Sequence, residues 1–173
     1  MTDYTYHIRT ARADELPALR EIERAAGALF HEAGLPAVAE MEAIPLVVLR
    51  SHQQQGLIWV AADEHDHPVG FALASIVDNR PHIEELSVHP AHSRRGLGTS
   101  LVEAVCDWAK IHGYSAVTLS TFRDVPWNAP FYARLGFRIL DDSELSVELQ
   151  EVREHERQMG LPIERRVLMR REL

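Results

Sequence analysis

The pattern of apolar and polar positions along the 173-residue chain predicts a mixed α/β fold. In several stretches apolar residues recur every three to four positions, a spacing that places them on one face of a helix. A helical region over 38–53 is weaker, because Pro45 interrupts it. The other predicted helices cover residues 14–28, 98–112, 128–135 and 142–158.

Alternating or continuously apolar segments predict strands. They cover residues 4–9, 57–62, 69–77, 82–88, 115–120, 137–140 and 165–171. Turn-forming residues at 63–68 and 78–81 join the three middle strands into a meander. A helix separates strand 82–88 from strand 115–120, so we expect these two strands to be parallel neighbours.

Composition predicts one globular domain over residues 1–173, because 46% of the residues are hydrophobic. No apolar run approaches the roughly 18 residues of a membrane span. The first residues lack the basic flank and apolar core of a signal peptide. Cys106 is the only cysteine, which excludes an internal disulfide. We therefore expect a cytoplasmic protein that does not bind membranes.

The net charge of −8 argues against nucleic acid as a partner, because nucleic-acid binding depends on Lys and Arg. The same charge suits cationic partners such as amines, and it also serves solubility. His65 and His67 lie with three acidic residues in a turn, but no further ligand pattern supports them. We expect no metal site.

One stretch carries the chemistry: an apolar strand ends at Pro90, a basic turn with two glycines follows, and a helix begins. Glycines let a backbone approach a ligand closely, and a helix N-terminus offers unpaired N–H groups to an anion. Arginines add charge-assisted bonds to phosphate oxygens. The turn therefore predicts a site for a phosphorylated cofactor, formed by Arg94, Arg95, Gly96, Leu97, Gly98 and Thr99.

Two common phosphate motifs fit this turn poorly. A P-loop requires Gly-Lys-Ser/Thr, which the chain lacks. A dinucleotide-binding fingerprint requires a small residue where Leu101 stands, and it belongs after the first strand of a β-α-β unit.

Three segments together resemble the GNAT acyltransferase superfamily. They are Val88-His89-Pro90, Arg95-Gly96-Leu97-Gly98-Thr99-Ser100-Leu101, and Asn128-Ala129-Pro130-Phe131-Tyr132-Ala133-Arg134-Leu135-Gly136-Phe137. The resemblance covers most of the chain and implies a mostly antiparallel sheet of six to seven strands flanked by helices. It also implies a splayed parallel strand pair that binds acyl-CoA. Ser93 departs from the family pattern, which usually has Gln or Arg there.

The resemblance implies that the basic turn holds the pyrophosphate of acetyl-CoA. It places the pantetheine along Leu86, Ser87 and Val88, at the end of the preceding strand. Asn128 either contacts the cofactor or caps the helix that follows it, and these two roles are compatible. No metal is implied.

Acyl transfer to an amine needs a base for the ammonium and an acid for the leaving thiolate. The resemblance makes Tyr132 the acid, although Tyr132 also fits a core position beside Phe131 and Phe137. It makes Glu84 or Glu85 the base. Adjacent strand residues face opposite sides of a sheet, so only one of the two is expected to face the acceptor, and Glu84 is preferred.

The resemblance therefore predicts an N-acetyltransferase that moves an acetyl group from acetyl-CoA to a primary amine of a small molecule. The acceptor classes are amines, polyamines and amino acids. One alternative is a non-catalytic acyl-CoA-binding regulatory protein. Another is the same chemistry on an aminoglycoside-type antibiotic or a protein N-terminus. Homodimer formation, which is common in the family, is left open.

Overall fold

The computed structural model describes residues 5–173, so Tyr4, where the first strand was predicted to begin, lies outside the described residues. The chain divides into two compact units. The first unit comprises Met1–Ala74 and Glu85–Val105, and the second comprises Ser75–Glu84 and Cys106–Leu173. Strands β3 and β4 and helix α4 contribute residues to both units.

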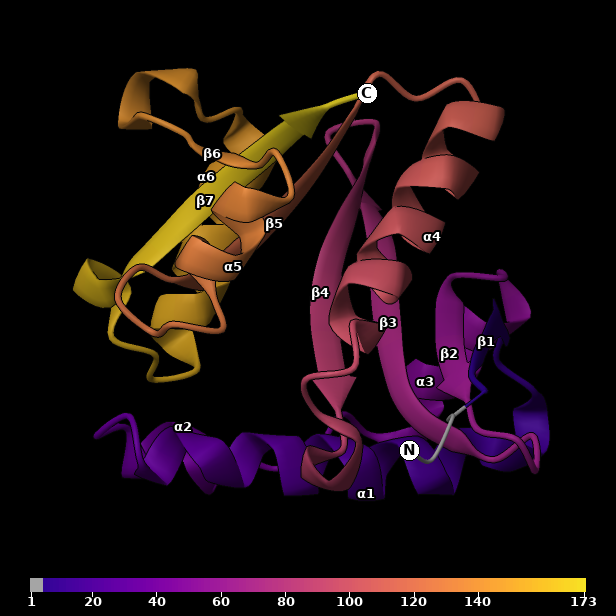
Figure 1. Cartoon of the computed structure of the whole chain (residues 1–173). Coiled ribbons are helices and arrows are strands. Elements are labelled where there is room, and N and C mark those ends of the chain that lie inside the picture. The colour runs from indigo at the N-terminus through magenta and orange to yellow at the C-terminus, as the bar shows by residue number, and fades with distance from the viewer. Residues whose placement is uncertain (1–4) are drawn as a thin grey trace. The chain divides into compact units, whose positions relative to one another are not determined.

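The strands form a mostly antiparallel sheet in the order β1-β2-β3-β4-β5-β7-β6, with β4 and β5 parallel (Figure 1). Their bounds are β1 His7–Thr10, β2 Ile58–Ala62, β3 Pro68–Val77, β4 Arg80–Val88, β5 Ala116–Phe122, β6 Arg138–Ile139 and β7 Arg166–Glu172. The predicted fold class and the parallel pair are confirmed.

The helices lie within a few residues of their predicted places. They are α1 Leu16–Gly27, α2 Pro36–Ala39, α3 Leu46–Gln54, α4 Leu97–Ile111, α5 Ala129–Arg134 and α6 Val147–Gln158. The weak region around Pro45 is two separate helices, α2 and α3, and Pro45 directly precedes α3. In the described part of the chain, no helix has both the length and the apolar character needed to cross a membrane.

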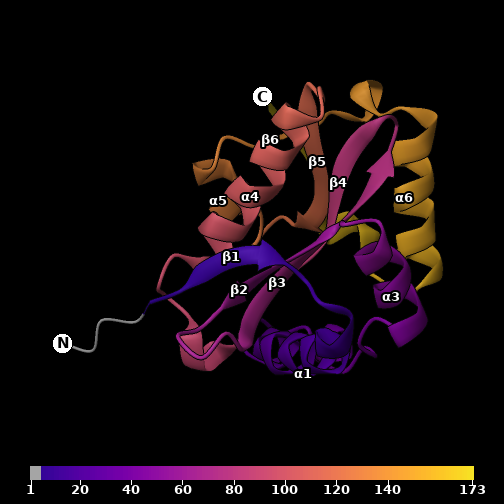
Figure 2. The same ribbon diagram turned by 90° about the vertical axis from the view of Figure 1, so that its right-hand side faces the viewer.

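The first unit has its core between α1, α3 and the strands β2 and β3 (Figures 1 and 2). The apolar stripe of α1 begins with Leu16, Leu19 and Ile22, which are buried as predicted. They pack with Leu49 of α3 and with apolar residues of the two strands. The helical spacing read from the sequence therefore identified the buried face of α1.

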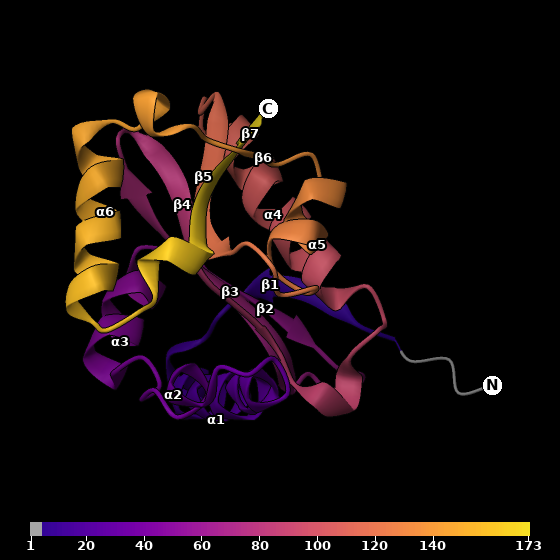
Figure 3. The ribbon, with the colours of Figure 1, turned by 90° about the vertical axis from the view of Figure 1, so that its left-hand side faces the viewer.

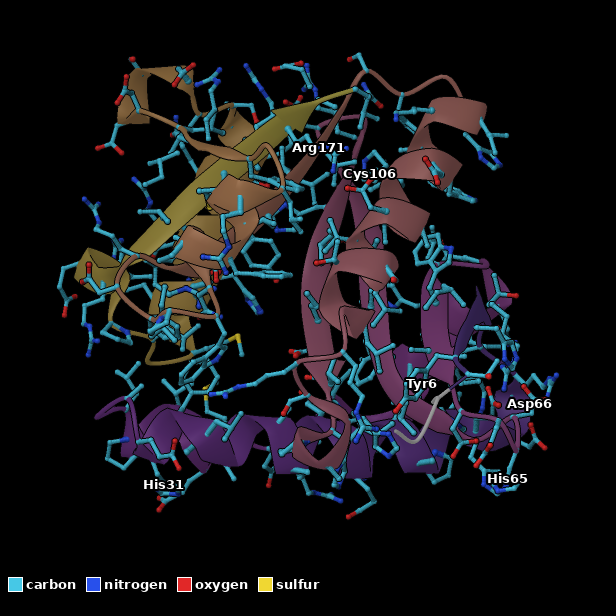
Figure 4. The ribbon with its side chains drawn as sticks, viewed as in Figure 1. Tyr6, His31, His65, Asp66, Cys106 and Arg171 are labelled. Atoms are coloured by element: carbon cyan, nitrogen blue, oxygen red, sulfur yellow. The ribbon has the colours of Figure 1, made fainter. Side chains whose placement is uncertain are left out.

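The turn between β2 and β3 is tied to the segment around β1 by an ion-pair network (Figure 4). Asp66 accepts hydrogen bonds from Arg9 and Arg12 and contacts His7. These contacts lower the pKa of the Asp66 carboxyl well below its usual range. Among residues 5–173, no group of three or more His, Cys, Asp or Glu residues is arranged to hold a metal ion.

The second unit is built on the antiparallel pair β5 and β7, whose register covers seven residues from each strand. Helices α5 and α6 lie on opposite sides of this pair (Figure 3). The apolar face predicted for α6 is confirmed, because Leu145 and Leu149 pack with Leu168 of β7. Val152 packs against the same cluster.

Two local predictions need correction. Strand β4 begins at Arg80, because the turn consists of Asp78 and Asn79 alone, both with positive φ. Asp and Asn tolerate this conformation, which a two-residue hairpin turn requires. The apolar stripe that the spacing predicts for α4 is Leu101, Ala104, Val105 and Trp108. The buried face also includes Val102, while Trp108 is only half-buried.

His82 is a buried polar residue at the start of β4, where this strand meets β5. Its Nδ1 lies 2.8 Å from Oγ1 of Thr118, which is also buried. Burial lowers the pKa of His82 to about 4, with Arg166 contributing in the same direction. The ring is therefore neutral in the folded protein at pH 7.

The substitution His82→Gln should make stability less sensitive to acid. Between pH about 6.5 and about 4 the unfolded chain binds a proton at His82 that the folded chain does not, so folding free energy is lost as the pH falls. For the wild type this loss is on the order of 2 kcal/mol at pH 5. Urea unfolding at pH 7 and pH 5 measures it, with the exposed His65→Gln as control. An identical pH dependence in wild type and His82→Gln contradicts the assignment.

Candidate active site

Strand β4 carries one residue more than the stretch of β3 that faces it. The two-residue turn places Val77 opposite Arg80. Further along, the His89 N–H donates to the Val69 carbonyl at 2.8 Å, which places these residues opposite each other. The extra residue indicates a β-bulge in β4 between Arg80 and His89.

Glu84 belongs to the second unit and is exposed. Its carboxylate accepts a hydrogen bond from the hydroxyl of Ser75, which precedes it in the hairpin. Glu84 is thus a solvated carboxylate held by one neighbouring hydroxyl.

Glu85 belongs to the first unit and is half-buried. The hydroxyl of buried Ser87 donates to the Glu85 carboxylate at 2.6 Å. This contact lies along one side of β4, because residues two apart in a strand point the same way. Ser87 therefore holds Glu85 through its side chain, in addition to its predicted place along the pantetheine.

Glu23 of α1 is another acidic residue of the first unit, and its negative partner is Glu85. Sequence reasoning missed Glu23. Its Oε2 accepts from the Ile44 N–H at 2.9 Å. Burial and, second to it, the negative charge of Glu85 together raise the pKa of Glu23 to about 7. A carboxyl that titrates near neutrality is unusual and is typical of functional sites.

The end of β4 packs closely on the backbone of β3. A Cβ atom placed on Gly70 would lie 3.1 Å from the Ser87 carbonyl oxygen and 3.2 Å from Cγ2 of Val88. Gly70 therefore allows the two strands to approach at Ser87 and Val88, which are two of the residues predicted to hold pantetheine.

The basic turn contains two left-handed residues just before α4 begins. Arg94 has φ of 60° and Gly96 has φ of 77°. The hydroxyl of Ser93 donates to the Pro90 carbonyl at 2.9 Å, so this side chain stabilises the preceding turn. Successive backbone N–H groups in a left-handed turn form a concave site for anions.

The first turn of α4 follows directly. Buried Leu97 anchors it, and the helical hydrogen-bond ladder starts with the Ser100 N–H on the Gly96 carbonyl. The N–H groups of Leu97, Gly98 and Thr99 precede that first bond, and a helix leaves such groups without intrahelical partners. The whole segment 94–99, which is predicted to hold the pyrophosphate, therefore lies within the first unit. It lies at the N-terminal end of α4, where the helix dipole favours negative charge.

The two arginines of the turn differ in their surroundings. Arg94 is exposed. Arg95 donates through Nη1 to the hydroxyl of Tyr6, and the same nitrogen lies 3.4 Å from Nδ1 of His92. Sequence reasoning missed Tyr6, because this residue precedes the turn by almost ninety positions.

Tyr132 and Asn128 belong to the second unit. Tyr132 is buried, and its ring makes edge contacts with Phe131 at 5.1 Å and with Phe137 at 5.8 Å between centroids. These contacts agree with the core position that the sequence also allowed for Tyr132. Asn128 lies at the N-cap position of α5, but its side chain makes no capping hydrogen bond to that helix.

Comparison with known proteins identifies the class. Residues 16–137 match the model of the acetyltransferase (GNAT) family. This match covers more than half of the chain and includes β4, the basic turn and α5. The chain belongs to the acetyltransferase (GNAT) family, as its motifs predicted.

One curated relative is the peptidyl-lysine N-acetyltransferase YjaB of Escherichia coli (strain K12). It is 30% identical over 98 residues, which make up 57% of this chain and 60% of that protein. The match thus spans somewhat less than two thirds of the relative's length.

Solved structures with the same fold cover nearly the whole chain. PaiA N-acetyltransferase from Thermoplasma acidophilum, in complex with coenzyme A, matches with a TM-score of 0.68 at 16% identity, over 98% of this chain and 99% of that chain. The solution structure of apo-form YjaB from Escherichia coli matches with a TM-score of 0.61 at 24% identity, over 97% of each chain. The fold is therefore that of the family.

The substitution Glu85→Gln should lower the pKa of Glu23 toward the ordinary value of about 4.3. The reason is that the charge of Glu85 opposes ionisation of Glu23. NMR titration of the Glu23 side-chain carboxyl carbon measures the effect, with the exposed Glu40→Gln as control. A Glu23 pKa that is unchanged in Glu85→Gln contradicts the coupling of the two carboxylates.

Proposed function

We propose that this protein is an N-acetyltransferase that transfers the acetyl group of acetyl-CoA to a primary amine of a small molecule. The observation that carries the proposal is the left-handed turn at Arg94 and Gly96 joined to the first turn of α4. Backbone N–H groups there suit the two phosphates of coenzyme A. Family membership supports this ligand over other diphosphates.

The pantetheine arm requires backbone partners for its two amides. In the proposal these are the groups of Leu86, Ser87 and Val88, directly before the turn. The same strand then leads from the phosphate end of the cofactor toward Glu85. This order along β4 would place the thioester close to the carboxylates.

The acceptor amine must lose a proton, since an alkyl ammonium has a pKa of about 10.4. The pair of Glu23 and Glu85 suits this step, because a general base works best with a pKa near the working pH. A carboxylate pair also attracts a cationic amine, in keeping with the net charge of −8. Glu84 is the second candidate, as an exposed carboxylate that acts directly or through water.

The chemical step is attack of the amine nitrogen on the thioester carbonyl, followed by cleavage of the C–S bond. The thiolate that leaves takes a proton from the Tyr132 hydroxyl in the proposal. Tyr132 has two roles here, because its ring also packs between Phe131 and Phe137. The variant Tyr132→Phe separates the roles, since it keeps the ring and removes the proton.

A lysine side chain of a peptide is the second candidate acceptor. The name of the curated relative, a peptidyl-lysine N-acetyltransferase, favours it. Free small amines and peptide lysines present the same alkyl ammonium group, so the carboxylate pair serves either.

Purified protein should release free thiol from acetyl-CoA only when an amine acceptor is present. A thiol-detection assay with polyamines, amino acids, aminoglycosides and lysine peptides measures this and ranks the acceptors. With the best acceptor found in this assay, Tyr132→Phe should lower kcat about 10²-fold or more while the protein stays folded. Coenzyme A binding without acceptor-dependent release would instead identify a non-catalytic acyl-CoA-binding protein.

The substitution Gly96→Ala should weaken coenzyme A binding about tenfold, because it disfavours the left-handed turn. Gly113→Ala is the matched control. Gly113 has φ of 81° at the end of α4, and a Cβ atom at either glycine would have no neighbour within 4 Å. Both variants should lose similar stability, and only Gly96→Ala should change the Kd measured by calorimetry. Equal affinities in the two variants would place the diphosphate site elsewhere.

A further inference from the structure

The hydroxyl of Tyr6 bonds one side chain just before the basic turn, His92, and one within it, Arg95. Tyr6 lies directly before β1, and its hydroxyl is 2.8 Å from Nδ1 of His92 (Figure 4). The same hydroxyl accepts from Nη1 of Arg95. Between His92 and Arg95 in the chain lie only Ser93 and left-handed Arg94.

A guanidinium only donates, so the Tyr6 oxygen accepts from Nη1 of Arg95. The phenol can donate its own proton to Nδ1 of His92 when the His92 ring is neutral and Nδ1 carries no proton. Burial, followed by the charge of Arg95 and by His89, lowers the pKa of His92 below its usual value. The lowered pKa favours the neutral ring, which can accept the phenol proton.

Further contacts stabilise the two histidines that begin the turn. The Tyr6 and His92 rings meet edge to face, with 5.8 Å between centroids. His89 accepts the Ala91 N–H on its Nδ1 at 3.1 Å and lies 6.3 Å from the His92 ring. The residues before the left-handed turn are thus held by side chains as well as by the backbone.

We propose that Tyr6 is a positioning residue for acyl-CoA binding: its hydroxyl bridges His92 and Arg95 and so holds the left-handed turn at Arg94 in its anion-binding shape. This rests on the proposed function, because the ligand of the turn is the diphosphate of coenzyme A. Tyr6 acts through the turn and does not itself touch the ligand.

The expected effect is on affinity and not on chemistry. A long arginine side chain and a short loop lose conformational freedom when a ligand orders them. The bridge orders Arg95 and the turn before the ligand arrives, so less freedom is lost on binding. Removing the hydroxyl should therefore raise the Kd of coenzyme A and the KM of acetyl-CoA, and leave kcat at saturation unchanged.

The test compares Tyr6→Phe, which keeps the ring and removes both hydrogen bonds, with the control Tyr114→Phe. Tyr114 stacks on Trp108, with 5.8 Å between ring centroids, and makes no part of the turn. Calorimetry should show a three- to tenfold higher Kd of coenzyme A in Tyr6→Phe, roughly the effect of one lost hydrogen bond. In the background His92→Ala the same substitution should have a smaller effect, because the bridge is already broken.

A second readout does not depend on the ligand. Hydrogen exchange of the amides at residues 93–96 in the ligand-free protein should be faster in Tyr6→Phe and unchanged in Tyr114→Phe. Wild-type affinity in Tyr6→Phe, with wild-type exchange, overturns the inference and leaves the proposed function standing. A different result would refute the proposed function: exchange is faster in Tyr6→Phe, but the wild-type protein does not bind coenzyme A. The role of Tyr6 in coenzyme A binding would then be refuted as well.

Discussion

The left-handed conformation at Arg94 and Gly96 is the constraint on which the site depends. It turns the chain from β4 into α4 within a few residues, so that backbone N–H groups gather at the start of a helix. This conformation is unfavourable for arginine, by roughly 1–2 kcal/mol for an L-residue. Neighbouring contacts offset the cost: Ser93 bonds back to Pro90, Leu97 is buried, and Tyr6 bridges the turn.

Much of the fold followed from the sequence, because apolar spacing reports burial directly. The stripe of α1, the apolar face of α6 and the parallel pair of β4 and β5 were all predicted and all found. The errors fell where local chemistry overrides spacing. Asp78 and Asn79 alone make the hairpin turn, and the extra residue in β4 leaves no trace in the apolar pattern.

The site was predictable where function resides in consecutive residues, and much less where it depends on contacts between distant segments. The turn at 94–99 is continuous, so its glycines and arginines could be read directly. Glu23 and Tyr6 are different, since each gains its role from a partner far along the chain. Nothing in the sequence around Glu23 indicates that burial and Glu85 will raise its pKa to about 7.

The most direct test of the account follows the backbone amide signals of the 15N-labelled protein by NMR while coenzyme A is added. The account predicts that the largest shifts fall on residues 94–99 and on Leu86 to Val88. It also predicts that 3′,5′-adenosine diphosphate, which lacks the pantetheine arm, leaves the signals of Leu86 to Val88 unchanged. Saturable shifts confined to other segments would contradict the account, because the diphosphate would then bind outside the left-handed turn.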